Sequence, residues 1–177
     1  TYSDLEVIVV DDGSDDDYAS HTVDQFSDTV NCVIHEENKG LSAARNTGIE
    51  HADGDYIAFL DDDDRWHEDK SKRQIEALER VPDAGLSTCR LAAIDLHGEL
   101  LRCDGGVVSG DIADRILTRN VIGSPSRVLV HRRALPSDRP FDEELPTKQD
   151  WDLYMRLCQE WAVVGVDEVL CYRTRHG

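Results

Sequence analysis

The chain has 177 residues, 40 % of them apolar, and a formal net charge of −18 at pH 7. This composition predicts a single folded domain and argues against a disordered chain, and no apolar run is long enough to cross a bilayer. The excess of negative charge would repel nucleic acid and anionic lipid headgroups, so we expect no nucleic-acid partner.

Three strand–helix pairs are predicted in the first half of the chain. The expected strands are short apolar runs, and the expected helices have caps or amphipathic spacing. In chain order the elements are strand 5–10, helix 16–26, strand 30–35, helix 40–51, strand 55–60 and helix 67–81. Such an alternation is typical of an α/β protein with a mostly parallel sheet flanked by helices.

The second half has a mixed pattern. An extended segment at 86–96, a turn at His97-Gly98 and a return through Leu100-Leu101 predict a hairpin. The elements that follow are helix 111–118, strand 127–131, helix 150–161 and strand 163–172. We therefore expect one α/β domain over residues 1–177, with mixed strands in its second half.

Two predicted strands end in clusters of acid. Asp11 and Asp12 follow the first strand, and four consecutive aspartates at 61–64 follow the third. Ligands of open α/β sheets collect at the carboxyl ends of the strands. Adjacent carboxylates repel one another unless positive charge lies among them, and oxygen ligands at this density suit Mg²⁺ or Mn²⁺. A solvated acidic loop is the alternative interpretation.

Arg45 shares a face of the predicted helix with Leu41 and Ile49. A guanidinium among apolar side chains needs an anionic or planar polar partner, and either a ligand or one of the many aspartates would serve. Just before this helix, Lys39 and Gly40 would offer a positive charge and backbone N–H groups to a diphosphate.

Asp150 begins the predicted helix 150–161. The residues alone give it a structural role, either as the N-cap or as a first-turn acid that is favoured by the helix dipole. A catalytic role for Asp150 requires support from outside the pattern.

Five segments carry a family resemblance: VIVVDDGSDD at 7–16, ENKGLSAARNTGI at 37–49, DGDYIAFLDDDD at 53–64, QDWDLYMRL at 149–157 and YRTRH at 172–176. Their order and spacing resemble those of glycosyltransferase family 2, the inverting enzymes of the GT-A fold. The second segment matches the family signature N-x-G-x-x-x-A-R-N-x-G at every fixed position. The resemblance extends over nearly the whole chain.

The resemblance implies metal-dependent transfer of a sugar, with inversion, from a nucleotide-diphosphate sugar to an acceptor hydroxyl. A UDP-sugar is the favoured donor, and the acceptor would be a glycan or a lipid-linked or protein-linked molecule, as in cell-envelope or glycoconjugate biosynthesis. Asp150 would be the general base. Mn²⁺ or Mg²⁺ would be held chiefly by Asp63, with Asp61 and Asp64 nearby. The donor would contact Asp11, Asp12, Lys39, Gly40, Arg45, Asp61 and Asp62.

The chain also departs from the family pattern. Gln149 stands where the family commonly has Glu. The strand and P-T-Y-N-type segment that usually open the domain are not in the sequence, so we expect an N-terminally truncated catalytic domain. Residues 1–82 would form its nucleotide- and metal-binding half and residues 83–177 its acceptor side.

Two other functions stay open. A sugar nucleotidyltransferase would be expected to show a Gly-rich phosphate loop near the start, and the sequence has none. The second alternative is a non-catalytic acidic metal-binding module.

The five cysteines are widely spaced and form no C-x-x-C pair. They predict neither a disulfide framework nor a zinc site, and we expect them as small core residues in a reducing compartment. The expected location is therefore the cytoplasm. Peripheral attachment to the inner face of the membrane is the alternative.

The charged residues generate a first prediction. Only four lysines stand beside fifteen arginines, and aspartate far exceeds glutamate. If this composition reflects adaptation to high salt, screening of the self-repulsion should raise the melting temperature between low and molar KCl. A thermal unfolding series in KCl measures this effect, and a melting temperature that stays flat or falls would remove the support for such an adaptation.

Overall fold

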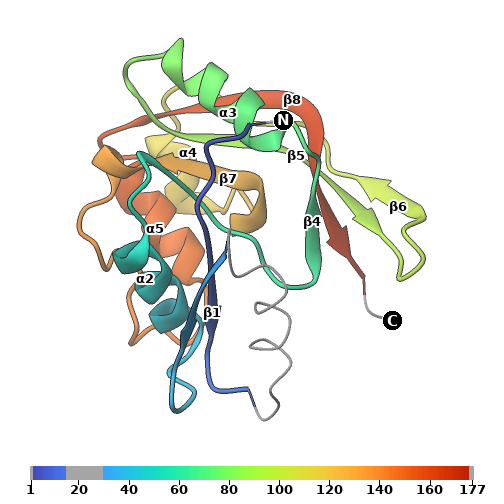
Figure 1. The fold of residues 1–177 in the computed structure, drawn as a ribbon. Helices are drawn as coiled ribbons and strands as arrows, with labels where there is room; N and C mark the ends of the chain where they lie inside the picture. Colours follow the sequence, from blue (N-terminus) through green and yellow to red (C-terminus); the bar gives the residue numbers. More distant parts are fainter. Residues whose placement is uncertain (1, 15–29, 176–177) are drawn as a thin grey trace.

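The structure is a computed structural model that describes residues 2–14 and 30–175. Its elements follow one another along the chain as Figure 1 shows. They are β1 Val7–Asp11, β2 Val30–Ile34, α2 Leu41–His51, β3 Tyr56–Ala58, β4 Asp64–Trp66, α3 Lys70–Glu79, β5 Ala84–Ile94, β6 Leu100–Cys103, α4 Ala113–Thr118, η1 Pro125–Arg127, β7 Val128–His131, η2 Arg132–Ala134, α5 Gln149–Leu157 and β8 Ala162–Thr174. The helix predicted at 16–26 lies outside the described residues.

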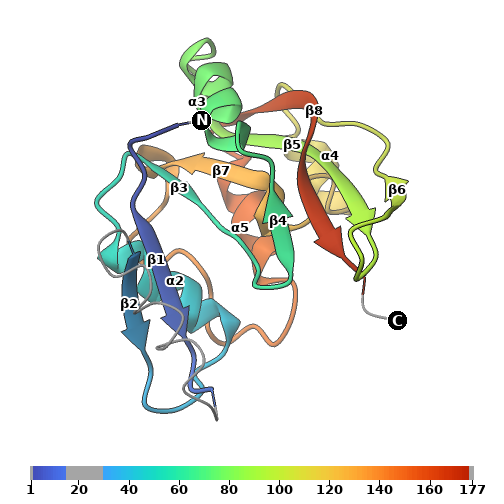
Figure 2. The ribbon, with the colours of Figure 1, turned by 45° about the vertical axis from the view of Figure 1, so that its right-hand side comes forward.

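The strands form two sheets. β1 and β2 pair in parallel, from Val7 opposite Val30 to Asp11 opposite Ile34. The larger sheet has the order β3-β7-β5-β8-β4, and β6 pairs with β5 beyond this path. Figure 2 shows the β1–β2 pair apart from the larger sheet, on the same side as α2.

The α/β class is confirmed, but the sheet is less parallel than expected. In the larger sheet β5 and β8 are parallel. The other four pairs, β3–β7, β4–β8, β5–β6 and β5–β7, are antiparallel. The sequence also failed to predict β4, which places Asp64 opposite Arg173 of β8. The short run Asp-Arg-Trp has no alternation of its own, so its extended form depends on pairing with the long strand β8.

The core fills both faces of the larger sheet. On one face Ile49 of α2 and Leu153 of α5 join Val130 of β7 in the largest buried cluster. On the other face Ile75 of α3 packs in a separate cluster with Leu129 of β7. Neighbouring residues of β7 thus face opposite layers, as the strand period requires.

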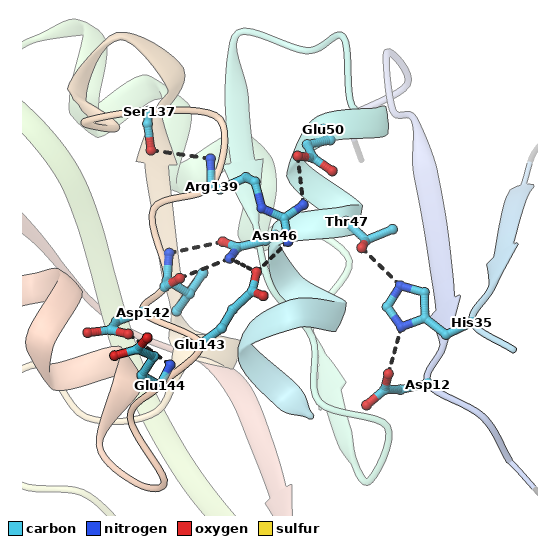
Figure 3. Close-up of polar contacts among 11 residues, drawn as sticks. Asp12, His35, Asn46, Thr47, Glu50, Ser137, Arg139, Asp142, Glu143 and Glu144 are labelled. Atoms are coloured by element: carbon cyan, nitrogen blue, oxygen red, sulfur yellow. Dashed lines mark hydrogen bonds and ion pairs between the residues drawn. The ribbon is translucent and has the colours of Figure 1, made fainter. Parts of the chain in front are cut away.

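Asn46 ties the second half of the chain to α2 (Figure 3). Its side chain is 1 % exposed, and its Nδ2 donates to the Phe141 carbonyl at 2.9 Å and to Glu143 Oε1 at 2.7 Å. Its Oδ1 accepts from the Phe141 amide at 2.9 Å. Arg139 adds ion pairs to Glu50 and Glu143. The segment that leads into α5 is therefore held against α2.

No helix among the described residues is both long and apolar enough to span a membrane.

The Asn46 contacts generate a second prediction. Asn46→Ala removes the hydrogen-bond partner of both backbone groups of Phe141 and opens a gap in a buried interface. We expect the free energy of unfolding to fall by about 3 kcal/mol, because orphaned buried polar groups cost about 1–3 kcal/mol each. Urea denaturation measures the free energy of unfolding. The control is Asn38→Ala at an exposed position, which should change this free energy by less than about 0.5 kcal/mol. A loss below about 1 kcal/mol in Asn46→Ala would show that this contact does not hold the segment.

Candidate functional site

Arg45 has an aspartate as its partner in the structure. Its Nη2 donates to Asp61 Oδ1 at 2.9 Å, and the guanidinium is 10 % exposed whereas Asp61 is one third exposed. The guanidinium carbon also lies 5.4 Å from the centre of the Phe141 ring, within the range of a cation–π contact. The pair joins α2 to the loop after β3 and accounts for a charged residue on an apolar helix face.

Asp150 lies in the first turn of α5, but it is not the N-cap. The helix begins at Gln149, and Lys148 occupies the cap position without a side-chain hydrogen bond to the helix. One oxygen of the half-buried Asp150 carboxylate accepts from Asn120 Nδ2 at 3.3 Å. The N-cap role considered from the sequence is therefore wrong, and the carboxylate has a side-chain partner from another part of the chain.

Tyr154, one helical turn after Asp150, joins these groups. Its side chain is buried, with 2 % exposed, and its hydroxyl has no hydrogen-bond partner in the part of the chain that the structure describes. Burial raises the pKa of Tyr154 well above the usual range, and the negative charges of Asp150 and Asp61 raise this pKa further. The positive charge of Arg45 acts in the opposite direction. The charges of Asp150, Arg45 and Asp61 thus all act on this hydroxyl, from α5, α2 and the loop after β3.

Sequence reasoning missed Tyr154 as a site residue, because it lies on the apolar face of the predicted helix. Its spacing of four residues from Asp150 was the available signal, since residues i and i+4 share a helix face.

Asp12 holds the loop between β2 and α2. Its carboxylate accepts from the backbone N–H groups of Lys39 at 2.9 Å and Gly40 at 2.7 Å. Nδ1 of His35 lies 2.6 Å from the same carboxylate. Burial alone would raise the pKa of Asp12, but these hydrogen bonds outweigh it, and the pKa is lowered.

These contacts correct one expectation. The N–H groups of Lys39 and Gly40 were expected to face a diphosphate, but Asp12 binds both of them. The reason is the close approach of the two loops. At Gly13, which has φ +77°, an added Cβ would lie only 2.7 Å from the Asn38 nitrogen. Glycine is required there on both counts.

His35 is a second residue that the sequence did not single out. Besides Asp12, its ring contacts Thr47 of α2, with 2.9 Å between Nε2 and the Thr47 hydroxyl (Figure 3). The imidazole is buried and links the end of β2 to α2. Nothing in the sequence distinguishes this histidine from an ordinary residue at the end of a strand.

Asp11 ends β1 and closes the turn that follows it. Its carboxylate accepts from the Ser14 N–H at 2.9 Å, and this hydrogen bond is the main cause that lowers the pKa of Asp11. The carboxylate is therefore charged and fixed at the carboxyl end of the strand, where a ligand of an α/β sheet would lie.

The four aspartates at 61–64 lie in different environments. Asp61 is paired with Arg45, and Asp62 and Asp63 are exposed. Asp64 is 7 % exposed, and neither of its carboxylate oxygens has a hydrogen-bond partner among residues 2–14 and 30–175. Burial raises the pKa of Asp64, and the nearby Ser126 hydroxyl and Arg173 oppose this shift only in part.

A metal site at these aspartates would have to be smaller than the sequence suggested. Within the described residues, no group of three or more His, Cys, Asp or Glu side chains is arranged to hold a metal ion. Mg²⁺ commonly takes one or two protein carboxylates and completes its shell with phosphate and water. Asp63 and Asp61, which are accessible, fit that donor set, whereas the predicted ligand Asp64 does not, because it is buried in β4 with a raised pKa.

The structure also has a groove of about 490 Å³. Its lining comes from the start of α2 and from the segment before α5. It consists of Lys39, Gly40, Leu41, Ser42, Glu143, Leu145, Pro146, Thr147, Lys148 and Gln149. Gln149, the residue before Asp150 in the chain, is thus part of the lining.

The fold matches that of solved glycosyltransferases. The crystal structure of S. aureus TarS in complex with UDP superposes with a TM-score of 0.71 at 21 % sequence identity, over 96 % of this chain and 51 % of that chain. TarS 1-349 alone gives a TM-score of 0.72 at 20 % identity. These likenesses confirm the GT-A-like fold that the sequence predicts.

Curated relatives agree with this match. A glycosyltransferase of Rickettsia conorii is 29 % identical over 171 residues, which are 96 % of this chain and 28 % of that protein. Chondroitin synthase of Escherichia coli is 27 % identical over the whole chain, which corresponds to 26 % of its own length. The chain thus spans about a quarter of each of these two relatives.

The family model described as "Glycosyl transferase family 2" matches residues 1–122. Because this match covers more than half of the chain, the protein belongs to glycosyl transferase family 2, as its motifs implied.

Proposed function

We propose that the protein transfers a sugar, with inversion and with the help of Mn²⁺ or Mg²⁺, from a nucleotide-diphosphate sugar to an acceptor hydroxyl. The observation that carries the proposal is that Asp150 and the hydrogen-bonded Arg45–Asp61 pair both act electrostatically on the buried Tyr154 hydroxyl. Asp150 can serve as a proton acceptor, and Arg45 supplies a cation for a leaving group. The structure of TarS with UDP supports a UDP-sugar as the donor.

Asp150 would take the proton of the acceptor hydroxyl. Its carboxylate is half-buried and is oriented by Asn120, so one oxygen remains for the incoming hydroxyl group. A base that is positioned in this way accelerates attack on the anomeric carbon. Attack from the side opposite the leaving diphosphate inverts the configuration at that carbon.

Charge on the leaving diphosphate would be balanced on the other side of the site. Asp63 and Asp61 would hold the divalent cation, which supplies positive charge to the leaving group when it is bound. Arg45 lies beside Asp61 and adds a second fixed positive charge. We assign Asp11 to the base or ribose of the donor and Asp62 to its phosphates, while Asp12 holds the adjoining loop in place.

The acceptor class stays a proposal. Chondroitin synthase among the relatives supports a glycan acceptor and a role in polysaccharide or glycoconjugate biosynthesis. Lipid-linked and protein-linked acceptors fit the same chemistry, because each presents a hydroxyl. A cytoplasmic enzyme, peripheral at the inner face of a membrane where its acceptor is lipid-linked, would suit such a role.

Hydrolysis of the donor separates the remaining alternatives. With Mn²⁺ present, a transferase slowly releases sugar and nucleoside diphosphate from a UDP-, GDP- or dTDP-sugar. A nucleotidyltransferase would instead form the nucleotide sugar from a nucleoside triphosphate and a sugar phosphate, and a metal-binding module would do neither. Release of free sugar without acceptor supports the proposal, and formation of pyrophosphate from the triphosphate contradicts it.

A third prediction concerns the metal. Asp63→Ala should weaken nucleotide-sugar binding in the presence of Mn²⁺ and leave binding in EDTA unchanged, because the carboxylate acts through the cation. Titration calorimetry with and without metal measures both values. Asp138→Ala, which removes an equal charge at an exposed position, is the control. Equal weakening with and without metal would show that Asp63 has a structural role.

A fourth prediction concerns the base. Asp150→Asn keeps the size of the side chain and can still accept from Asn120, but it does not take up a proton at neutral pH. We expect turnover to fall by two to four orders of magnitude, or roughly 3–5 kcal/mol of barrier, with normal donor binding and a melting temperature within a few degrees of wild type.

The neighbouring acid provides the matched comparison for Asp150→Asn. Asp152 pairs with Arg156 at 2.6 Å on a different side of α5, so Asp152→Asn should be much milder in rate. If Asp152→Asn abolishes turnover while Asp150→Asn retains most of it, the base has been assigned to the wrong aspartate.

A further inference from the structure

The groove at the start of α2 and α5 has a positively charged lining, which is unusual in so acidic a protein. The chain has four lysines and a net charge of −18, yet Lys39 and Lys148 both line the groove. Of the other two lysines, Lys70 is completely buried and Lys72 lies on α3. Neither groove lysine has an ion-pair partner within the described residues. The groove therefore holds two of the three lysines that can meet a ligand.

The start of α2 adds to this positive potential. Gly40 occupies the cap position without a side-chain hydrogen bond, and the first turn contains no acidic residue. Within the part of the chain that the structure describes, the N–H groups of Leu41, Ser42 and Ala43 thus have neither a cap nor a helical partner. The N-terminal end of a helix favours an anion. Because α2 has eleven residues, its dipole is fully developed at this end.

Ser42 provides an independent sign of a missing partner. It lines the groove and is 4 % exposed, and its hydroxyl has no hydrogen-bond partner among the described residues. An unsatisfied buried hydroxyl costs free energy that a bound acceptor atom would restore. Rotation about χ1 turns such a hydroxyl to another staggered position without moving the helix.

The acid in the lining offsets only part of this charge, through the electrostatic attraction between Lys39 and Glu143. Glu143 is the one acidic residue along the groove, and its carboxylate is already bound by Asn46 and by Arg139. The hydrogen bond from Asn46 is the main cause that lowers the pKa of Glu143. Lys148 also lies 5.3 Å from the Trp151 ring, which positions its ammonium group without neutralising it.

We propose that this groove binds a carboxylate or phosphate group carried by the sugar acceptor. The inference rests on the proposed transferase function and names the substrate class. An acceptor must reach Asp150, and the lining of the groove includes Gln149, the residue that precedes Asp150 on α5. Lys39 and Gly40, which were expected to contact the donor, do line the groove, but their N–H groups are bound by Asp12. The donor contacts proposed above, namely Asp11, Arg45, Asp61, Asp62 and Asp63, are absent from its lining. A compact oxyanion fits two ammonium groups, free N–H groups and a hydroxyl.

Direct binding is tested with inorganic phosphate and the complete chain, without donor or metal. Titration at constant ionic strength should show saturable binding by wild type. Lys148→Asn removes the charge while tolerating the left-handed backbone at this position, where φ is 64°. We expect it to weaken phosphate binding about tenfold, the size of one charge-assisted contact, and Ser42→Ala to weaken it less. Lys72→Gln on α3, distant from α2 in Figure 1, is the matched control.

A transfer assay identifies the source of the anion. It compares a glucuronoside acceptor with the matching glucoside, and Lys148→Asn should reduce the preference for the glucuronoside about tenfold. A rise in the KM of the donor instead would place the donor diphosphate in the groove and overturn the proposal. Equal phosphate affinity in wild type and Lys148→Asn, or no saturable binding at all, would overturn it as well.

These outcomes are separate from those of the transferase proposal. Donor hydrolysis with Mn²⁺ and no acceptor does not use the groove, so a protein that hydrolyses donor but does not bind phosphate refutes only the groove. A protein that binds phosphate through Lys148 but hydrolyses no nucleotide sugar supports an anion site and refutes the transferase.

Discussion

The buried amide of Asn46 is the interaction on which the arrangement of the site depends. It hydrogen-bonds both backbone groups of Phe141 and the side chain of Glu143, and so it holds the segment before α5 against α2. A single buried side chain satisfies three partners, and the two backbone groups of the buried Phe141 would be costly to leave unpaired. The same contact sets the position of the first turn of α5, with Asp150, relative to the Arg45–Asp61 pair on the opposite side of the site.

Most of the aspartates at the site have partners that offset their negative charge. Asp61 is paired with Arg45, Asp12 is bound by two N–H groups and a histidine, and Asp11 is bound by Ser14. Asp64 is buried with a raised pKa instead. Each carboxylate thus has a different electrostatic environment, so adjacent aspartates of identical chemistry differ in what they can do. The accessible ones are suited to a cation, and the groove with Lys148 is suited to an anion.

These opposite charges are close in space because two helices begin near each other. α2 starts after the loop held by Asp12, and α5 starts after the segment held by Asn46. A helix that begins without a side-chain cap leaves its first N–H groups to water or to a ligand. The starts of both helices line the proposed acceptor groove.

Local sequence determined most of the elements, the family and the identity of the candidate residues. Apolar runs predicted β1, β2, β5 and β8, and the fixed positions of the A-R-N motif placed Arg45 on α2. Period and motif are properties of neighbouring residues, so the sequence alone carries them. Tertiary structure decided which of the four aspartates is buried, that Lys39 and Gly40 give their N–H groups to Asp12, and that β4 is a strand. It also decided that Tyr154, His35 and Asn46 belong to the site, because their roles depend on partners distant in the chain, which no local pattern encodes.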